Sequence, residues 1–381
     1  MNADLRTTAW RRGARTIKKI RPRPAVAAGG LAATAVLTAS LAGAPFAQAS
    51  VASAGPAVTG HTVETNGPAA AYAAHVRAYW TRDRMLSARN ADAVASKSAH
   101  VKNPGAGTRE PGKTGQPGHV AGTAPTQRLG GGIKSVPQSH RATPAYGSSG
   151  TVWPGSPYLP PATTTGKVFF TTNNGARWVC SASTVNSNGK DAVITAAHCV
   201  YGNLGGEAPG EGWHSNWVFV PDYNNGNAPY GTWTARQLWT LTNYINNGGS
   251  MADEADDIGT AVMNTNGYGQ HIVNVVGGQG IEWNYPYQYV YDFGYPAQPP
   301  FTGQVLDYCS GWEFGWYPGT MGLNCNFNGG SSGGPWLASF NGEWGYINGI
   351  NDFGYPSLPN SIFSAYFASN AGNLYNAVAG L

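Results

Sequence analysis

Short β-type segments separated by turns dominate the sequence from about residue 151 to the C-terminus, and they constrain the fold more than any other feature. The segments are rich in Val, Ile, Thr and aromatic residues, and Gly, Asn and Pro fill the turns. About 230 residues of such closely spaced strands suit an all-β domain of two small antiparallel barrels. The predicted strands include 167–171, 177–181, 192–196, 216–221, 232–241, 258–263, 271–276, 288–293, 303–308, 344–350 and 361–367, and a short helix is expected at 371–379.

The first 49 residues have the layout of a secretory signal peptide. A basic stretch that contains Arg11, Arg12 and Lys18 precedes an Ala/Leu/Val run, and residues 47–49 read Ala-Gln-Ala, a small-residue cleavage site. An uncleaved membrane anchor is the alternative, because the apolar run is nearly long enough to span a bilayer. The Gly and Ala content of the run and the cleavage site favour removal. We therefore expect a secreted, extracellular protein without a stable membrane anchor.

Residues 50–149 are predicted to form a largely disordered pro-segment and linker. Within them, 69–95 favours helix, with Thr81 as the N-cap of a helix over 82–95, whereas 103–149 is mostly Gly, Pro, Ser and Thr. Residues 1–150 carry 19 Lys and Arg against 5 Asp and Glu, and residues 151–381 carry 4 against 14. The acidic C-terminal part gives no support to nucleic-acid binding. A basic pro-segment would suit it as an inhibitor or folding aid, although a solvated linker has the same composition.

Two short motifs supply a proton acceptor and a nucleophile. Residues 195–199 read Thr-Ala-Ala-His-Cys and place His198 after an apolar strand, and residues 330–335 read Gly-Ser-Ser-Gly-Gly-Pro and place Ser332 in a glycine-rich turn. Hydrolysis of an amide by a serine needs a base for the hydroxyl proton, a carboxylate that orients the base, and N–H donors for the oxyanion. His214 and His271 are the other histidines after residue 150, and we expect them to be surface or packing residues.

The orienting carboxylate is expected directly before the apolar strand that begins at residue 258. Asp257 occupies that position, and Asp256 is an alternative one residue away. With Asp253 and Glu254, the same residues also suit a solvated acidic loop or a calcium site, although no EF-hand ligand spacing is present.

Residues 150–381 resemble the chymotrypsin-like serine proteases, most closely their secreted bacterial branch that includes glutamyl endopeptidases. The histidine motif matches letter for letter, the serine motif matches the family's GDSGGP except for Ser331, and the order His, Asp, Ser agrees. The resemblance implies two antiparallel six-stranded β-barrels, at about 150–275 and 276–381, preceded by the signal peptide (1–49) and the pro-segment (50–149).

The resemblance also assigns roles to residues. It implies that His198 is the general base, Asp257 the orienting acid and Ser332 the nucleophile, with the amides of Gly330 and Ser332 as oxyanion donors. Protein or peptide substrates are expected, together with the chain's own pro-segment as a partner. We expect a monomer that needs no cofactor and no metal. The G-x-S-x-G elbow of α/β-hydrolases fits the serine motif too, but no histidine follows Ser332, as that fold requires.

The four cysteines all lie after residue 179, and an even number in an exported chain favours two disulfides over a metal site. The sequence alone leaves three pairings open. The resemblance selects the sequential pairing, in which Cys180 joins Cys199 and Cys309 joins Cys325.

Departures from the family bear on activation and on specificity. Ser331 replaces the acid that pairs with a freed N-terminus in the animal enzymes, so removal of a covering pro-segment is the expected route of activation. Asn326 stands where trypsin-like members have an acid, which gives no support to cleavage after Lys or Arg. The predicted substrate pocket also contains Asn351, Asp352, Phe353 and Gly354, although Asp352 could instead cap a turn.

A second function class remains open in the sequence. The chain has 20 Tyr and 13 Trp, and pairs such as Trp283 with Tyr285 have same-face strand spacing. Such aromatic pairs more often pack in a core. An inactive homologue that binds protein or polysaccharide is therefore the alternative to an enzyme.

Overall fold

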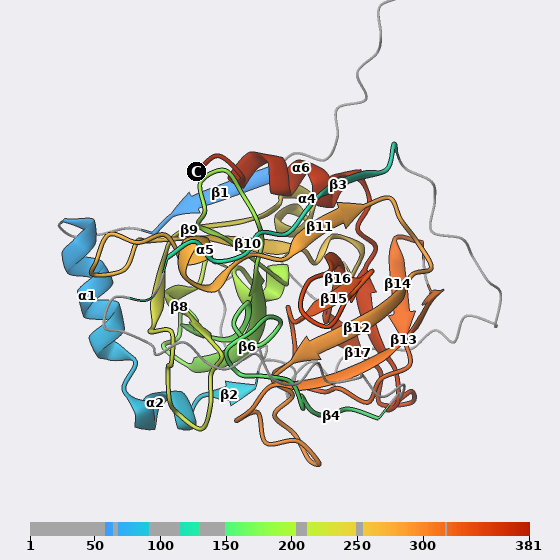
Figure 1. Ribbon diagram of the computed structural model, residues 1–381, viewed down its shortest axis with the longest axis horizontal. Helices are drawn as coiled ribbons and strands as arrows, with labels where there is room; N and C mark the ends of the chain where they lie inside the picture. The colour runs from blue at the N-terminus through green and yellow to red at the C-terminus, as the bar shows by residue number, and fades with distance from the viewer. Residues whose placement is uncertain are drawn as a thin grey trace, which may run out of the picture. The chain divides into compact units, whose positions relative to one another are not determined.

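The computed structural model describes residues 58–63, 68–90, 115–127, 129, 149–202, 212–248, 254–316 and 318–381. The predicted signal peptide at 1–49 lies outside these residues. Strands make up most of the regular structure in the described part (Figure 1). Within these ranges, no helix combines the length and the apolar character needed to cross a membrane.

A closed antiparallel barrel of six strands forms first along the chain. The strands pair in the order β5-β6-β7-β10-β9-β8, and β8 pairs back with β5. Every residue of β5 and of β10 is buried, because the outer faces of these strands lie against other parts of the molecule. The strands are β5 (Thr165–Thr171), β6 (Arg177–Thr184), β7 (Ala192–Thr195), β8 (Ser215–Pro221), β9 (Trp233–Leu241) and β10 (Gly259–Met263).

The strands of the second sheet pair in the same order along the chain as those of the first barrel. β12 pairs with both β13 and β15, and the pairing continues through β14, β18 and β17 on one side and through β16 on the other. β17 follows β16 after two residues, so the two together take the place of one strand. The predicted all-β class with two barrels is confirmed. The strands are β12 (Tyr289–Gly294), β13 (Asp307–Gly315), β14 (Thr320–Leu323), β15 (Pro335–Ala338), β16 (Tyr346–Ile350), β17 (Phe353–Gly354) and β18 (Ile362–Ala365).

The connection between the barrels differs from the prediction. The β-branched run at 271–276 predicts a strand, but the structure has a short helix there, α5 (Ile272–Val276). Gly277 ends it with a φ of 85°, a conformation that favours glycine. The apolar side chains of α5 are buried, so they pack a connection rather than one face of a sheet. β11 (Gly280–Trp283) follows and pairs in parallel with β16.

Two of the remaining helices flank the barrels. α4 (Thr242–Asn246) follows β9, and α6 (Ser369–Val378) confirms the helix predicted near the C-terminus. In addition, β4 (Thr151–Val152) pairs with β13.

Parts of the predicted pro-segment and linker are integral to the barrels. β1 (Val58–Thr62) pairs with β9, β2 (Arg89–Asn90) pairs with β6, and β3 (Gly118–Val120) pairs with β11. The prediction of a structureless linker is therefore wrong for β3, because pairing with an existing strand supplies hydrogen bonds that composition does not reveal.

Two helices lie between β1 and β2. They are α1 (Ala69–Tyr79) and α2 (Arg82–Leu86). The Thr81 side chain caps α2 by accepting a hydrogen bond from the Arg84 N–H at 3.3 Å, as predicted. However, α2 ends at Leu86, and the predicted continuation to Ala95 is wrong because β2 begins at Arg89.

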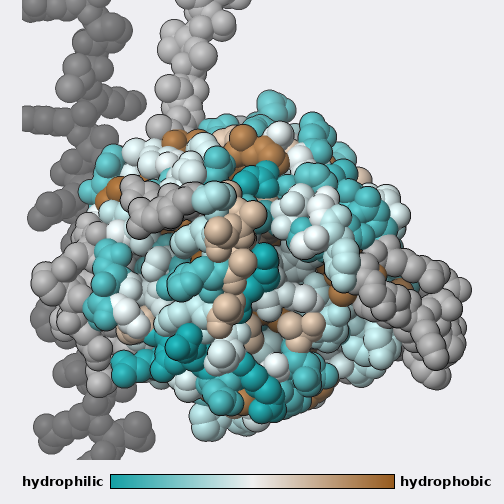
Figure 2. Space-filling model, turned by 90° about the vertical axis from the view of Figure 1, so that its left-hand side faces the viewer, coloured by the Kyte–Doolittle hydropathy of each residue, from teal (hydrophilic) through white to brown (hydrophobic). Residues whose placement is uncertain are grey.

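One hydrophobic core runs through both barrels and into this N-terminal segment. It includes Phe169 of the first barrel, Phe293 of the second and Trp80 after α1. Trp80 is 4% exposed, and its ring centre lies 5.4 Å from that of Phe169. Burial of a large apolar side chain stabilises the fold by about 1.5–3 kcal/mol. Figure 2 shows the side of the molecule that carries α1, with a mostly hydrophilic surface and only small, separated hydrophobic patches.

Candidate active site

His198 and Asp257 meet because they follow and precede two paired strands. β7 leads into η1 (Ala197–Cys199), which carries His198, and η2 (Glu254–Asp256) leads to Asp257 just before β10. β7 and β10 are antiparallel neighbours, so these two ends lie together. The His198 Nδ1 atom lies 2.7 Å from Asp257 Oδ2, and the His198 backbone N–H donates to Asp257 Oδ1 at 2.9 Å. Both side chains are 1% exposed.

The acids next to Asp257 point to other partners. Asp256 Oδ1 accepts a hydrogen bond from the Asn370 side chain at 3.2 Å. The Tyr355 hydroxyl donates to the Glu254 carboxylate, with 3.1 Å to each oxygen. Among the described residues, neither group of possible metal ligands includes these carboxylates. Asp253 lies outside the described residues.

His214 and Trp217 support the histidine loop from below. The His214 Nε2–H donates to the His198 carbonyl oxygen at 3.0 Å, and the Trp217 indole N–H donates to the Cys199 carbonyl oxygen at 2.9 Å. Burial lowers the pKa of His214 to about 3, so this imidazole is neutral, and it stacks on Phe170. His214 is a packing residue, as expected, but its role in holding His198 has no signal in the sequence Trp-His-Ser.

The Ser332 loop is fixed to the first barrel by backbone contacts. The Ser181 N–H donates to the Ser332 carbonyl oxygen at 2.7 Å, and the Ser181 hydroxyl donates to the Gly330 carbonyl oxygen at 2.9 Å. The Ser331 hydroxyl donates to the Asn328 carbonyl oxygen within the same loop. Ser181, on β6, is a second residue that the sequence did not single out, although it joins the two barrels beside Ser332.

Glycines at two positions of this loop are required by conformation and by space. Gly330 has a φ of 103° and Gly333 a φ of 81°, which are values that favour glycine. A Cβ atom on Gly333 would lie 2.1 Å from Thr195 Oγ1 and 2.5 Å from the Ser181 carbonyl oxygen. Among the described residues, the Gly330 N–H meets no hydrogen-bond acceptor, so it can serve as a donor to a ligand.

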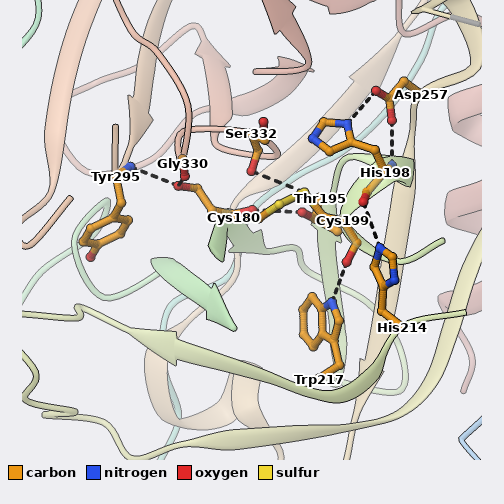
Figure 3. The surroundings of a disulfide bond; sticks show 11 residues. Cys180, Thr195, His198, Cys199, His214, Trp217, Asp257, Tyr295, Gly330 and Ser332 are labelled. Carbon is orange, nitrogen blue, oxygen red and sulfur yellow. Dashed lines mark hydrogen bonds and ion pairs between the residues drawn. A yellow bond between two sulfur atoms is a disulfide. The ribbon is translucent and has the colours of Figure 1, made fainter. Parts of the chain in front are cut away.

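Figure 3 shows how the three side chains lie. The His198 ring stands between the other two, with one ring nitrogen facing the Asp257 carboxylate and the other turned toward Ser332. The Cys180–Cys199 disulfide lies beneath them and joins β6 to the histidine loop.

Both disulfides have the pairing that the resemblance implied. Cys180 is bonded to Cys199, and Cys309 is bonded to Cys325. In the described part of the chain, the two groups of possible metal ligands consist of these cysteines with His198 or with Asp292. Disulfide sulfurs are not the thiolates that bind metals, so neither group offers a metal site.

The predicted pocket residues are divided between interior and surface. Asn351 is fully buried, and its amide donates to Asp292 Oδ1 at 2.7 Å while its oxygen accepts from the Trp336 indole N–H at 2.9 Å. Burial raises the pKa of Asp292 well above its usual range. In this structure the Asn351 side chain therefore holds the interior of the second barrel, and its contact with a substrate stays a prediction.

The other pocket residues lie near that position in the chain. The buried Asp352 carboxylate accepts a hydrogen bond from the Ala365 N–H. Phe353 is buried and stacks on Phe363, whereas Gly354 is exposed. Asn326 accepts a hydrogen bond from the Gly150 N–H at 2.7 Å, near the start of the predicted protease domain.

Comparisons with known proteins give matches among solved structures. No protein-family model matches the chain, and no curated protein matches it. The protease Anisep from Arthrobacter nicotinovorans is 37% identical with a TM-score of 0.52, and the match covers 58% of this chain and 97% of that chain. The thermostable serine protease AL20 from an extremophilic microorganism is 37% identical with a TM-score of 0.51, covering 57% and 97%. A Glu endopeptidase in complex with MPD is 18% identical with a TM-score of 0.47, covering 61% and 97%, which is too distant to inform specificity.

Proposed function

The chain belongs to the chymotrypsin-like family of bacterial serine proteases, and we propose that it is an endopeptidase that hydrolyses peptide bonds through an acyl-enzyme on Ser332. The observation that carries the proposal is the double hydrogen bond between His198 and the buried Asp257. A carboxylate on Nδ1 keeps the ring proton there, which leaves Nε2 as the proton acceptor. A buried glycine-rich loop that presents Ser332 to this ring supports the same reaction.

In the proposed first step, Ser332 Oγ attacks the carbonyl carbon of the substrate while His198 Nε2 takes the hydroxyl proton. The negative charge that develops on the carbonyl oxygen is held by the N–H groups of Gly330 and Ser332. The C–N bond then breaks, and the imidazolium returns the proton to the leaving amine. Water attacks the acyl-enzyme with His198 again as the base, and the hydroxyl of Ser332 is regenerated.

We further propose that the protein is exported and made as a pro-enzyme, with residues 50–149 as the pro-segment and 150–381 as the protease domain. Two disulfides support an oxidising compartment, because such bonds persist outside the cytosol. The basic N-terminal stretch with an apolar run and a small-residue cleavage site supports export. Protein or peptide substrates and the chain's own pro-segment are the partners that this proposal requires.

Replacement of Ser332 by alanine tests the proposal. We expect Ser332→Ala to fold normally, to resist labelling by a fluorophosphonate, and to lose hydrolysis of a casein-type substrate down to the residual rate of the oxyanion site. The wild-type processed protein should gain the mass of the label at Ser332. Wild-type activity in the variant would reject the nucleophile. Failure of the folded, processed wild-type protein to react would instead favour the inactive binding homologue.

A further inference from the structure

β2 lies on the edge of β6 that leads into the active site. Arg89 pairs with Trp178 and Asn90 pairs with Val179, and the two strands run in parallel. The next residue of β6 is Cys180, which the disulfide joins to the histidine loop. A segment from far upstream in the sequence therefore occupies the strand edge that ends beside the catalytic residues. Figure 1 shows β2 running from α2 back toward β6.

Asn90 also contacts the second barrel next to the Ser332 loop. Its side-chain amide donates to the Ala297 carbonyl oxygen at 3.4 Å. The Ala297 N–H donates to the Gly329 carbonyl oxygen at 2.7 Å, and a Cβ atom on Gly330 would lie 2.9 Å from the Ala297 Cβ. Asn90 thus bridges from β6 to the residues that pack against the proposed oxyanion loop.

Two paired residues hold a strand only weakly, but β2 is anchored by the segment before it. Val76, Trp80 and Met85 of this segment are buried in the core of the first barrel. The Trp80 indole N–H donates to the Asn216 carbonyl oxygen at 2.6 Å, and β1 pairs along its whole length with β9. An anchored segment keeps β2 at a high effective concentration at β6, whether or not the chain after it is intact.

The charges of the two parts are complementary. Residues 58–90 carry four Arg and no Lys against two Asp and Glu, which gives 4 − 2 = +2, and residues 151–381 carry 4 − 14 = −10. Opposite net charges favour association and make it sensitive to salt.

We propose that residues 58–90 are an inhibitor built into the chain, and that β2 blocks the passage of an extended substrate along β6 past Ser332. The inference rests on the proposed endopeptidase function. The edge of β6 next to Cys180 belongs to the first barrel, whereas the predicted pocket at 351–354 belongs to the second. A substrate that extends from this pocket across Ser332 therefore has to lie along the edge of β6. One strand edge accepts one neighbour, and β2 already fills it. A small reagent that does not lie along β6 can still reach Ser332 and react with it.

Activation requires more than a cut in the chain. Because β1, α1 and α2 hold the segment through the core and through strand pairing, a cut in the chain after Asn90 does not by itself release it. The cut segment is expected to stay bound until it is displaced or degraded. Activation therefore needs the loss of the segment and not just the loss of its covalent connection.

The first test compares a small reagent with a large substrate on the uncut chain, whose mass is verified before each assay. Asn90→Pro removes a backbone donor of β2 and the amide that reaches Ala297. We expect it to raise casein hydrolysis per labelled Ser332 at least about tenfold, the factor that corresponds to 1.4 kcal/mol. The rate of fluorophosphonate labelling should stay within about twofold of wild type, because that reagent does not use β6. The matched control is Ala69→Pro at the first position of α1, an exposed and uncharged site where proline is tolerated, and it should resemble wild type.

The second test uses the Ser332→Ala chain, which cannot process itself. Hydrogen exchange of the amides at 177–179 should be at least about tenfold faster when Asn90→Pro is added, and unchanged when Ala69→Pro is added. Equal casein hydrolysis in wild type and Asn90→Pro, with unchanged exchange at 177–179, would overturn the inhibitor proposal. Absence of labelling at Ser332 in every chain, cut or uncut, would overturn the proposed function instead. If Asn90→Pro misfolds, it loses labelling while Ala69→Pro keeps it. The rate of hydrogen exchange at 177–179 in Asn90→Ala then decides.

Discussion

Replacement of Asp257 by asparagine separates orientation of the base from packing of the loop. Asp257 accepts two hydrogen bonds, from the backbone N–H and from Nδ1 of His198. An asparagine of nearly the same shape can keep the first bond through its oxygen. Its NH₂ group then faces Nδ1 and donates to it, so the ring proton moves to Nε2. The ring would present an N–H instead of a lone pair to Ser332.

The expected loss follows from the wrong tautomer. A triad with its orienting carboxylate changed to an amide loses about four orders of magnitude in turnover. At 1.36 kcal/mol for each factor of ten, this is about 5.5 kcal/mol in the activation barrier. Stability should change much less, by about 1–3 kcal/mol, because one of two buried hydrogen bonds is kept.

The assay is the second-order rate of fluorophosphonate labelling at Ser332, with casein hydrolysis as a second readout and urea unfolding as the check on folding. Asp256→Asn is the matched control, because the Asp256 carboxylate accepts a hydrogen bond from Asn370, whereas Asp257 accepts the bonds from His198. We expect that control to stay within about twofold of wild type. A rate of one tenth of wild type or more in Asp257→Asn, or an equal loss in Asp256→Asn and Asp257→Asn, would rule out Asp257 as the residue that orients His198.

Two further predictions concern the frame around the site. Burial lowers the pKa of Lys167 from 10.5 to about 7, and its ammonium donates to the Gly303 carbonyl oxygen at 2.6 Å. The folded protein then binds fewer protons than the unfolded chain between these pH values, so the free energy of unfolding should rise with pH across this window in the wild type. Lys167→Met should abolish the rise and be more stable near pH 7 by several kcal/mol, on the order of the lost desolvation cost. Urea unfolding at several pH values measures this, and a variant whose free energy of unfolding rises with pH as steeply as that of wild type would contradict it. Gly333→Ala should lower the melting temperature and abolish labelling, because its Cβ would meet Thr195 and Ser181. Gly231→Ala has the same φ of 81° with nothing within 4 Å and should lose only about 1–2 kcal/mol; equal losses in the two variants would show that the contact is unimportant.

The parts of the fold that could be predicted are those with local signals. Alternating β-type runs and turns predict the two barrels, and Thr81 before a polar helix predicts its own capping bond. The run at 271–276 misled the prediction because β-branched residues also pack well in a buried connection. β3 could not be predicted, because a strand that pairs on an existing edge needs no hydrophobic pattern of its own.

The same distinction applies to the site. His198 and Ser332 could be predicted because they stand in sequence motifs that are specific to one protease family. Asp257 could be distinguished from Asp256 only by the geometry of the loop, in which Asp257 bonds to His198 and Asp256 to Asn370. His214 and Ser181 act through backbone contacts with residues distant in sequence, from the His198 carbonyl to the Ser332 carbonyl. Backbone partners of this kind leave no trace in the residue types around them. The pairing of β2 with the edge of β6 is likewise a tertiary contact that the sequence of β2 does not predict.

His198, the proposed proton acceptor, and Ser332, the proposed nucleophile, belong to different barrels, which the contacts of Ser181 with the Ser332 loop join beside the proposed reaction centre. Catalysis thus depends on the interface between the two barrels and not only on the folding of each one. A small separation of the two barrels would abolish activity while each sheet stayed folded. Thermal inactivation should therefore precede the loss of β-structure. A ligand that binds between the barrels and separates them would act as an inhibitor.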